Sequence, residues 1–241
     1  MRGWSAAWRM AQIGWKREWP GMLFTFLFAV YCGWIGGFTL GEILRYEDTI
    51  RSTYMITDWF YLLVLPVLGQ LMNCTVFAIS RGDIHTKKIA HWRTMPIPLE
   101  TIAGTRLLNA VLLTAVNGLV FLGLQYAVSP AIREQLPLAG WLCAGLVWIG
   151  YALAVNAVLI WFELGCSGKV YVRFYWAFVG CCLLLSGVLT LSGVHLVRAV
   201  IREMQAGHYI WLVISPVAAA AALYAGYRLT LRRMRGRSFA L

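Results

Sequence analysis

Apolar runs of roughly 20 residues recur along the chain, and they constrain its fold more than any other feature. A run of about 20 apolar residues makes a helix long enough to cross the hydrocarbon core of a bilayer. Inside a bilayer every backbone polar group must be bonded within the protein, so such runs become helices. The expected spans are 21–40, 58–79, 107–128, 138–161, 174–194 and 209–229. The sequence therefore predicts an all-α polytopic membrane protein with six transmembrane helices.

Composition supports this class and predicts a single transmembrane domain over residues 1–241. The chain is 60% hydrophobic with a mean hydropathy of +0.68, and only 13% of its residues are charged. Soluble domains carry about 25% charged residues. The six cysteines lie in or beside apolar runs without a CxxC pair, so we interpret them as small membrane-core residues. The spans leave no stretch for a soluble catalytic domain of about 50 residues or more.

The cations of the chain predict its orientation. With the N-terminus in the cytoplasm, 16 Lys and Arg residues fall on the cytoplasmic side and five outside. This asymmetry follows the positive-inside rule, and an even number of spans puts both termini in the cytoplasm. The net charge of +11 is thereby explained by topology, which removes the argument for a nucleic-acid partner.

Two amphipathic segments lie outside the expected spans. In residues 1–20 four tryptophans share one helical face opposite four cations, which predicts a helix in the headgroup plane that bends into the first span at Pro20. These membrane-interface residues are Trp4, Trp8, Trp15 and Trp19. Residues 195–204 predict a second, external amphipathic helix. Gly33 and Gly37 form a G-x-x-x-G pair that suggests a packing face within the chain or a dimer face.

Polar side chains inside the spans are candidates for function because each is costly in hydrocarbon. They are amides, so either they bond neighbouring helices or they line a substrate path. The candidates for a path are Gln70, Asn73, Asn109, Asn117 and Asn156. The carboxylates Glu42, Asp58 and Glu163 stand at span ends, where we expect them to reach headgroups or water. Without buried carboxylates, a proton or sodium relay is disfavoured.

The sequence lacks the motifs of an enzyme. The closest match to a phosphate loop, "ELGCSGKV", has Glu163 and Val170 where that loop needs Gly and Ser or Thr. The four histidines are too scattered for a metal site, and neither G-x-S-x-G nor H-E-x-x-H occurs. We therefore expect no catalytic residue, no metal and no cofactor within the chain.

The connector between the second and third spans is basic, amphipathic and interrupted by proline. Asp83 can cap a helix over residues 83–95, with Ile84, Ile89, Trp92 and Met95 on one face and Lys87 on the other. Pro96 and Pro98 end this helix, and the chain restarts as a helix at Leu99. A short helix joined stiffly to two spans can carry a push from a soluble partner into the membrane.

The layout and the stretch "RTMPIPLETIAGTR" resemble the membrane-spanning permease subunits of type 2 ABC transporters. In that family an amphipathic helix precedes six spans, and a coupling helix between spans two and three docks on a separate ATPase. Arg93, Pro96, Ile102 and Arg106 match a recurring family pattern. Pro98 departs from the small polar residue expected two positions after the turn proline.

The resemblance implies a half-transporter of a bacterial plasma membrane. Two permease copies, or this chain and a related permease, would form the pathway, and two ATPase subunits would carry ATP and Mg. The cargo would be hydrophobic or amphipathic, such as a drug, an antimicrobial peptide or a lipid. The implied ATPase-coupling residues are Ile84, Lys87, Lys88, Ile89, Trp92, Arg93, Met95, Pro96, Pro98 and Arg106.

Two other functions stay open. A non-transporting assembly or immunity factor would use the Trp-rich belt to bind membrane lipids or a peptide. A secondary carrier is disfavoured, because the spans hold neither buried carboxylates nor an evident inverted repeat.

Overall fold

The computed structural model describes residues 2–46, 50–72, 87, 90–92, 94 and 97–236, with side chains from Trp4 onward. Its regular elements are all helices over this part of the chain, as the sequence predicts. They are α1 (Arg2–Arg45), α2 (Arg51–Val67), α5 (Leu99–Val128), α6 (Pro130–Gln135), α7 (Leu138–Gly165), α8 (Gly168–Leu191), α9 (Leu196–Gln205) and α10 (Ile210–Gly236).

Five of the described helices are long and apolar enough to cross a membrane, namely α1, α5, α7, α8 and α10. The exposed surfaces of these helices support this assignment, because most of the large exposed side chains of α8 and α10 are apolar. The chain is thus an all-α protein with several membrane-spanning helices.

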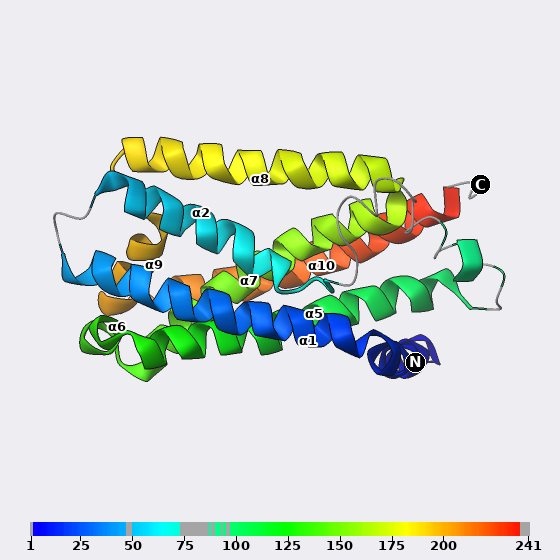
Figure 1. The fold of residues 1–241 in the computed structure, drawn as a ribbon. Helices are drawn as coiled ribbons and strands as arrows, with labels where there is room; N and C mark the ends of the chain where they lie inside the picture. Colours follow the sequence, from blue (N-terminus) through cyan, green and yellow to red (C-terminus); the bar gives the residue numbers. More distant parts are fainter. Residues whose placement is uncertain are drawn as a thin grey trace.

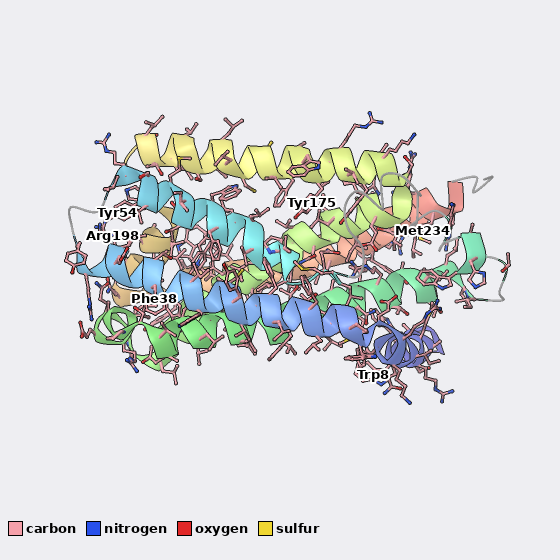
Figure 2. All side chains as sticks on the ribbon, viewed as in Figure 1. Trp8, Phe38, Tyr54, Tyr175, Arg198 and Met234 are labelled. Atoms are coloured by element: carbon pink, nitrogen blue, oxygen red, sulfur yellow. The ribbon has the colours of Figure 1, made fainter. Side chains whose placement is uncertain are left out.

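The helices form an elongated bundle with two distinct ends (Figure 1). The short helices α6 and α9 lie at one end, which we call the α9 end. Residue 2, the start of α5 and the end of α10 lie at the other, which we call the connector end. Figure 2 shows Tyr54 and Arg198 near the α9 end and Trp8 and Met234 near the connector end.

Glycines bring the long helices into close contact within one chain. α1 packs along α5, and a Cβ on Gly33 would lie 2.9 Å from the carbonyl oxygen of Phe121. A Cβ on Gly37 would lie 3.2 Å from the Cα of Gln125. The G-x-x-x-G pair of α1 is therefore a packing face against α5, and the alternative of a dimer face does not fit it.

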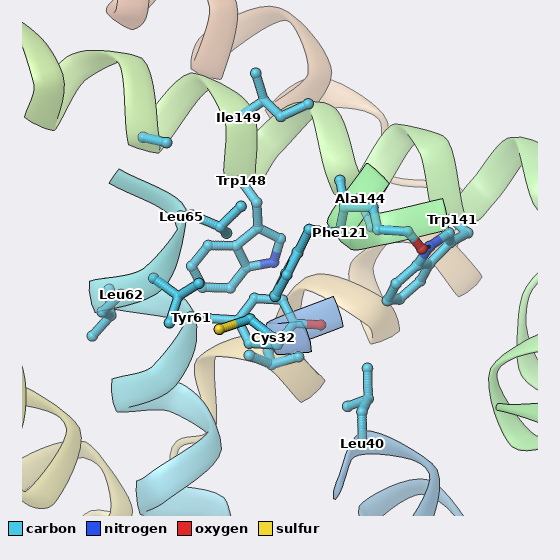
Figure 3. Packing of buried hydrophobic residues seen from close by; sticks show 14 of the residues in the cluster. Cys32, Leu40, Tyr61, Leu62, Leu65, Phe121, Trp141, Ala144, Trp148 and Ile149 are labelled. Carbon is cyan, nitrogen blue, oxygen red and sulfur yellow. Dashed lines mark hydrogen bonds between the residues drawn. The ribbon is translucent and has the colours of Figure 1, made fainter. Parts of the chain in front are cut away.

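Aromatic side chains fill the core toward the α9 end (Figure 3). Tyr61 of α2, Phe121 of α5 and Trp148 of α7 meet with ring centroids 5.1 to 5.6 Å apart. The apolar face of α9 closes this core through Val197, Ile201 and Met204, all buried. The boundaries Leu196–Gln205 lie one residue from the expected 195–204.

A second cluster lies between α5, α7 and α10 at the connector end. Its largest buried members are Ile102, Leu107, Ile160, Leu164, Leu231 and Met234. We call it the connector-end cluster. It holds the three helix ends together where the connector joins the bundle.

α1 bends at Glu18, whose φ of −102° and ψ of 15° are not helical, two residues before Pro20. Proline lacks an N–H and its ring disturbs the preceding turn, which explains a bend at this position. The segment before the bend lies across the bundle (Figure 1). The continuous helix then runs to Arg45.

α2 differs from the expected span over 58–79. It begins at Arg51 and ends at Val67, within the bundle, and residues 68–72 follow as turns, a bend and irregular chain. Residues 73–79 lie outside the described residues. Pro66 and Gly69 stand at this end, where proline removes a helical donor and glycine permits close packing.

Candidate functional site

The end of α2 inside the bundle exposes backbone carbonyls that neighbouring helices satisfy. Asn156 of α7 donates from Nδ2 to the carbonyl of Pro66 at 3.0 Å, and Asn117 of α5 donates to Leu68 at 3.0 Å. Thr25 of α1 donates to the carbonyl of Gln70 at 3.3 Å. The carbonyl of Pro66 also accepts from the backbone N–H of Gly69 at 3.1 Å. An unbonded carbonyl in the hydrocarbon region costs several kcal/mol, so the side-chain donors help to make the helix end tolerable there.

Gly69 lets these side chains approach the backbone. A Cβ at this position would overlap the side chains of Thr114 and Asn156. Both of these side chains are fully buried, and Asn156 also donates to the carbonyl of Ala152 at 3.0 Å. A larger residue at position 69 would separate α2 from α5 and α7.

An ion pair lies next to this helix end. Arg106 of α5 donates from Nη2 to Glu163 of α7 at 2.8 Å, and its Nε lies 3.0 and 2.9 Å from the two carboxylate oxygens. The two side chains are only 14% and 12% exposed. Glu163 was expected to reach headgroups or water, and its pairing with Arg106 corrects that expectation.

Gln70 links the ion pair to the amides. Arg106 donates to the side-chain oxygen of Gln70, and Gln70 donates to the side-chain oxygen of Asn156. A continuous chain of hydrogen bonds therefore runs from Glu163 through Arg106, Gln70 and Asn156 to the carbonyl of Pro66. We call these residues the polar chain. It joins α5 and α7 to the end of α2.

The segment of α1 before its bend docks on α5. Buried Ala7 and Ala11 form its contact face, and Thr105 donates to the carbonyl of Ala7 at 3.1 Å. Trp15 donates from its indole nitrogen to Asn109 at 2.9 Å. Asn109 of the expected path set thus bonds a neighbouring segment.

The tryptophans expected at the membrane interface divide into two groups. Trp4, Trp8 and Trp19 are 62%, 43% and 60% exposed, so they can reach the headgroup region. Trp15 is partly buried and turns toward Asn109, although its ring still meets that of Trp8 at 5.5 Å. The contact face of this segment consists of small residues, so the segment lies close to α5 and Trp15 is brought against that helix.

The connector is described only in part. Lys87 and residues 90–92 are helical, and Pro98 precedes the start of α5. Trp92 is partly buried and packs against the connector-end cluster, whereas Lys87 is exposed. The other expected coupling residues of this segment lie outside the described residues, as does Asn73: Ile84, Lys88, Ile89, Arg93, Met95 and Pro96.

Arg106, one of the residues that the resemblance implies for ATPase coupling, lies inside the bundle. It is buried in the bundle because its position, two turns into α5, faces α7. Trp92 likewise packs on the bundle itself. Of the described coupling residues, Lys87 and Pro98 are the exposed ones.

Asp58 takes a role at the α9 end that sequence reasoning did not find. Its side chain accepts hydrogen bonds from the backbone N–H groups of Leu196 and Val197, each at 2.9 Å. Asp58 is 1% exposed and so does not reach water as expected. A carboxylate on the first N–H groups of a helix acts as its N-cap, here supplied by another helix.

Within the described residues, no group of three or more His, Cys, Asp and Glu side chains could hold a metal ion. The arrangement joins helices through charge and amide contacts. Chemically it provides positioning and electrostatics at the end of α2.

Comparison of the chain with protein-family models, with curated proteins and with solved structures gives no match.

Proposed function

We propose that the chain is the permease subunit of an ATP-driven exporter of the type 2 ABC class. It would move a hydrophobic or amphipathic cargo across a bacterial plasma membrane. Two cytoplasmic ATPase subunits would bind ATP and Mg, because the sequence holds no phosphate loop. A second copy, or a related permease, would complete the pathway.

The observation that carries this proposal is the contact between the connector and the bundle. Trp92 of the connector packs against the connector-end cluster, which joins α5, α7 and α10. A force on the connector would therefore act on three spans at once. Lys87, five residues before Trp92, is helical and exposed, so an acidic surface of a partner could contact it.

The end of α2 at Val67, inside the bundle, offers a place for movement. Its end is bonded to α1, α5 and α7 through side chains, whereas an uninterrupted helix would be bonded within itself. The end of α2 can therefore take a new position when a few of these side-chain hydrogen bonds change partners. We propose that motion of the connector shifts the end of α2 relative to the polar chain.

The topology expected from the charges agrees with this arrangement. α2 begins at the α9 end and α5 begins at the connector end (Figure 1). We propose six crossings with both termini in the cytoplasm and with the connector end on the cytoplasmic side.

Co-purification tests the proposal. The tagged chain is isolated from native membranes, and the mass and the subunit composition of the purified complex are measured. We expect two permease and two ATPase subunits. Charge reversal of the connector, Lys87→Glu with Lys88→Glu and Arg93→Glu, should release the ATPase.

A matched control reverses Lys169 and Arg173, which are exposed at the start of α8. This variant should retain the ATPase. Isolation of the chain without an ATPase, or equal retention by both charge-reversal variants, would refute the coupling role.

The exposure of Trp4, Trp8 and Trp19 favours one other function, a non-transporting factor that binds lipid or peptide at the interface. Replacing these three residues with Ala distinguishes the two. Loss of ligand binding in a chain that associates with no ATPase would support the second function.

A further inference from the structure

Basic side chains and apolar side chains share one exposed face of α10. Arg228, Arg232 and Arg235 follow one another at spacings of four and three residues, so they lie on the same side of the helix. Tyr224 and Val217 precede Arg228 by four and eleven residues on that side. The face is therefore cationic near the connector end and apolar further into the bundle.

A cavity of about 290 Å³ opens beside the cationic part of this face. That volume is about ten times the roughly 30 Å³ that one water molecule takes in the liquid. Its lining is Glu100, Tyr227, Arg228, Leu231, Arg232 and Arg235. The walls thus combine three guanidinium groups, one carboxylate and an apolar floor.

The charge of this cavity is not neutralised by the described residues around it. Glu100 accepts from Arg235 at 2.6 Å and so pairs with one of the three cations. No ion pair joins Arg228 or Arg232 to any described residue. Two exposed guanidinium groups therefore remain beside the cavity, and the planar donors of arginine fit phosphate oxygens.

The surroundings place this cavity at the level of lipid headgroups. Trp4 stacks on Tyr227 of the cavity wall with ring centroids 6.5 Å apart. Tryptophan and tyrosine concentrate where the hydrocarbon meets the headgroups. Deeper along the same face, Tyr224, Val217 and Val213 are 65%, 62% and 65% exposed, which suits acyl chains.

We propose that the cavity between α5 and α10 binds the headgroup phosphate of an anionic phospholipid. Arg228 and Arg232 contact the phosphate, Tyr227 and Trp4 border the headgroup, and the acyl chains lie along α10. The apolar continuation of the face selects a lipid over a soluble phosphate, which would contact the cationic part alone.

Native mass spectrometry of the purified full chain tests this proposal. Dioleoylphosphatidylglycerol and dioleoylphosphatidylcholine are added separately, and the bound lipid is counted. We expect the anionic lipid to bind more tightly. A cation near an anionic membrane contributes about 1 kcal/mol, a factor of about five, so Arg228→Gln with Arg232→Gln should weaken binding about 25-fold.

The matched control is Lys169→Gln with Arg173→Gln, which removes two exposed cations four residues apart from the start of α8. It should bind the anionic lipid like the wild type. Arg228→Lys with Arg232→Lys keeps the charge and should retain most of the affinity, which excludes a folding defect as the cause.

Equal binding of the anionic lipid by the wild type and the Arg228→Gln, Arg232→Gln variant would overturn the proposal. An equal loss in the control would also overturn it, because net charge alone would then explain binding. Complete displacement of the lipid by about 10 mM inorganic phosphate would assign the cavity to a soluble anion.

Discussion

At the scale of single residues, the ion pair between Arg106 and Glu163 matters most because it is buried. Removing one member of such a pair leaves an uncompensated charge away from water. Arg106 also donates to Gln70, so its position affects the end of α2. Removing one member of the pair should therefore lower the stability of the chain by a measurable amount.

Glu163→Gln should destabilise the chain by about 3 to 5 kcal/mol, because the charge of Arg106 stays buried without its partner. Adding Arg106→Gln should recover part of this loss, since no buried charge then remains. Differential scanning fluorimetry in detergent measures both.

Glu203→Gln serves as the control for this pair. Glu203 and His208 form an exposed pair at 3.2 Å, and such pairs contribute about 0 to 1 kcal/mol. An equally small effect of Glu163→Gln would contradict the burial of the Arg106 pair.

Asp58 is the other residue with a distinct expected effect. Asp58→Ala removes both acceptors from the N–H groups of Leu196 and Val197, and loss of an N-cap costs about 0.5 to 2 kcal/mol. Hydrogen exchange should become faster at the start of α9. Glu42→Ala, an exposed carboxylate at the end of α1, should leave that exchange unchanged.

If Asp58→Ala leaves exchange at Leu196 and Val197 as slow as in the wild type, the cap between α2 and α9 is not formed in solution.

At the scale of elements, the end of α2 is held by other helices. Asn156→Leu removes the donor to the carbonyl of Pro66 and the acceptor for Gln70. The carbonyl of Pro66 keeps its bond from the backbone N–H of Gly69, but the side-chain amide of Gln70 loses its acceptor. Leaving such a polar group unbonded costs about 1 to 3 kcal/mol. We expect lower thermal stability and faster hydrogen exchange over residues 66–72.

Val158→Leu, two residues away on an exposed face of α7, is the control and should have little effect. Comparable destabilisation by both variants would mean that the amide contacts of Asn156 do not hold the end of α2.

Some elements were predictable because their signal is local. Pro98 fixes the start of α5 at Leu99, and the 3.6-residue period locates α9 to within one residue. The end of α2 at Val67 was not predictable in this way, because Pro66 and Gly69 lie in an apolar run that is long enough for one span. What stabilises this end comes from α1, α5 and α7.

The candidate site was predictable as a set of residues but not as a network. From the sequence, the intramembrane amides either bond neighbouring helices or line a substrate path, and the described ones bond neighbouring segments. The residues that bond one another in the described structure are remote in sequence. Arg106 and Glu163 are 57 positions apart, and Asp58 and Val197 are 139 apart. Periodicity describes faces of one helix and cannot pair residues at such separations.

At the scale of the whole molecule, the two ends of the bundle should face opposite sides of the membrane. Ser192 and Lys169 are exposed at opposite ends of α8. In a variant without the six native cysteines, a membrane-impermeant maleimide should label Ser192→Cys in intact cells. Lys169→Cys should react only after permeabilisation.

The reverse labelling pattern would invert the orientation and remove the connector from the cytoplasm. Labelling of both positions in intact cells would mean that α8 does not cross the membrane.

The most direct measurement of the account is the movement of the connector when the ATPase binds nucleotide. Spin labels at Thr94→Cys and Lys169→Cys, both at exposed positions, report the distance between the connector and the start of α8 in the co-purified complex. ATP with vanadate should change this distance by about 2 to 5 Å, the scale of helix shifts in switching proteins. An unchanged distance in a complex that hydrolyses ATP would contradict the proposal that the connector moves the membrane helices.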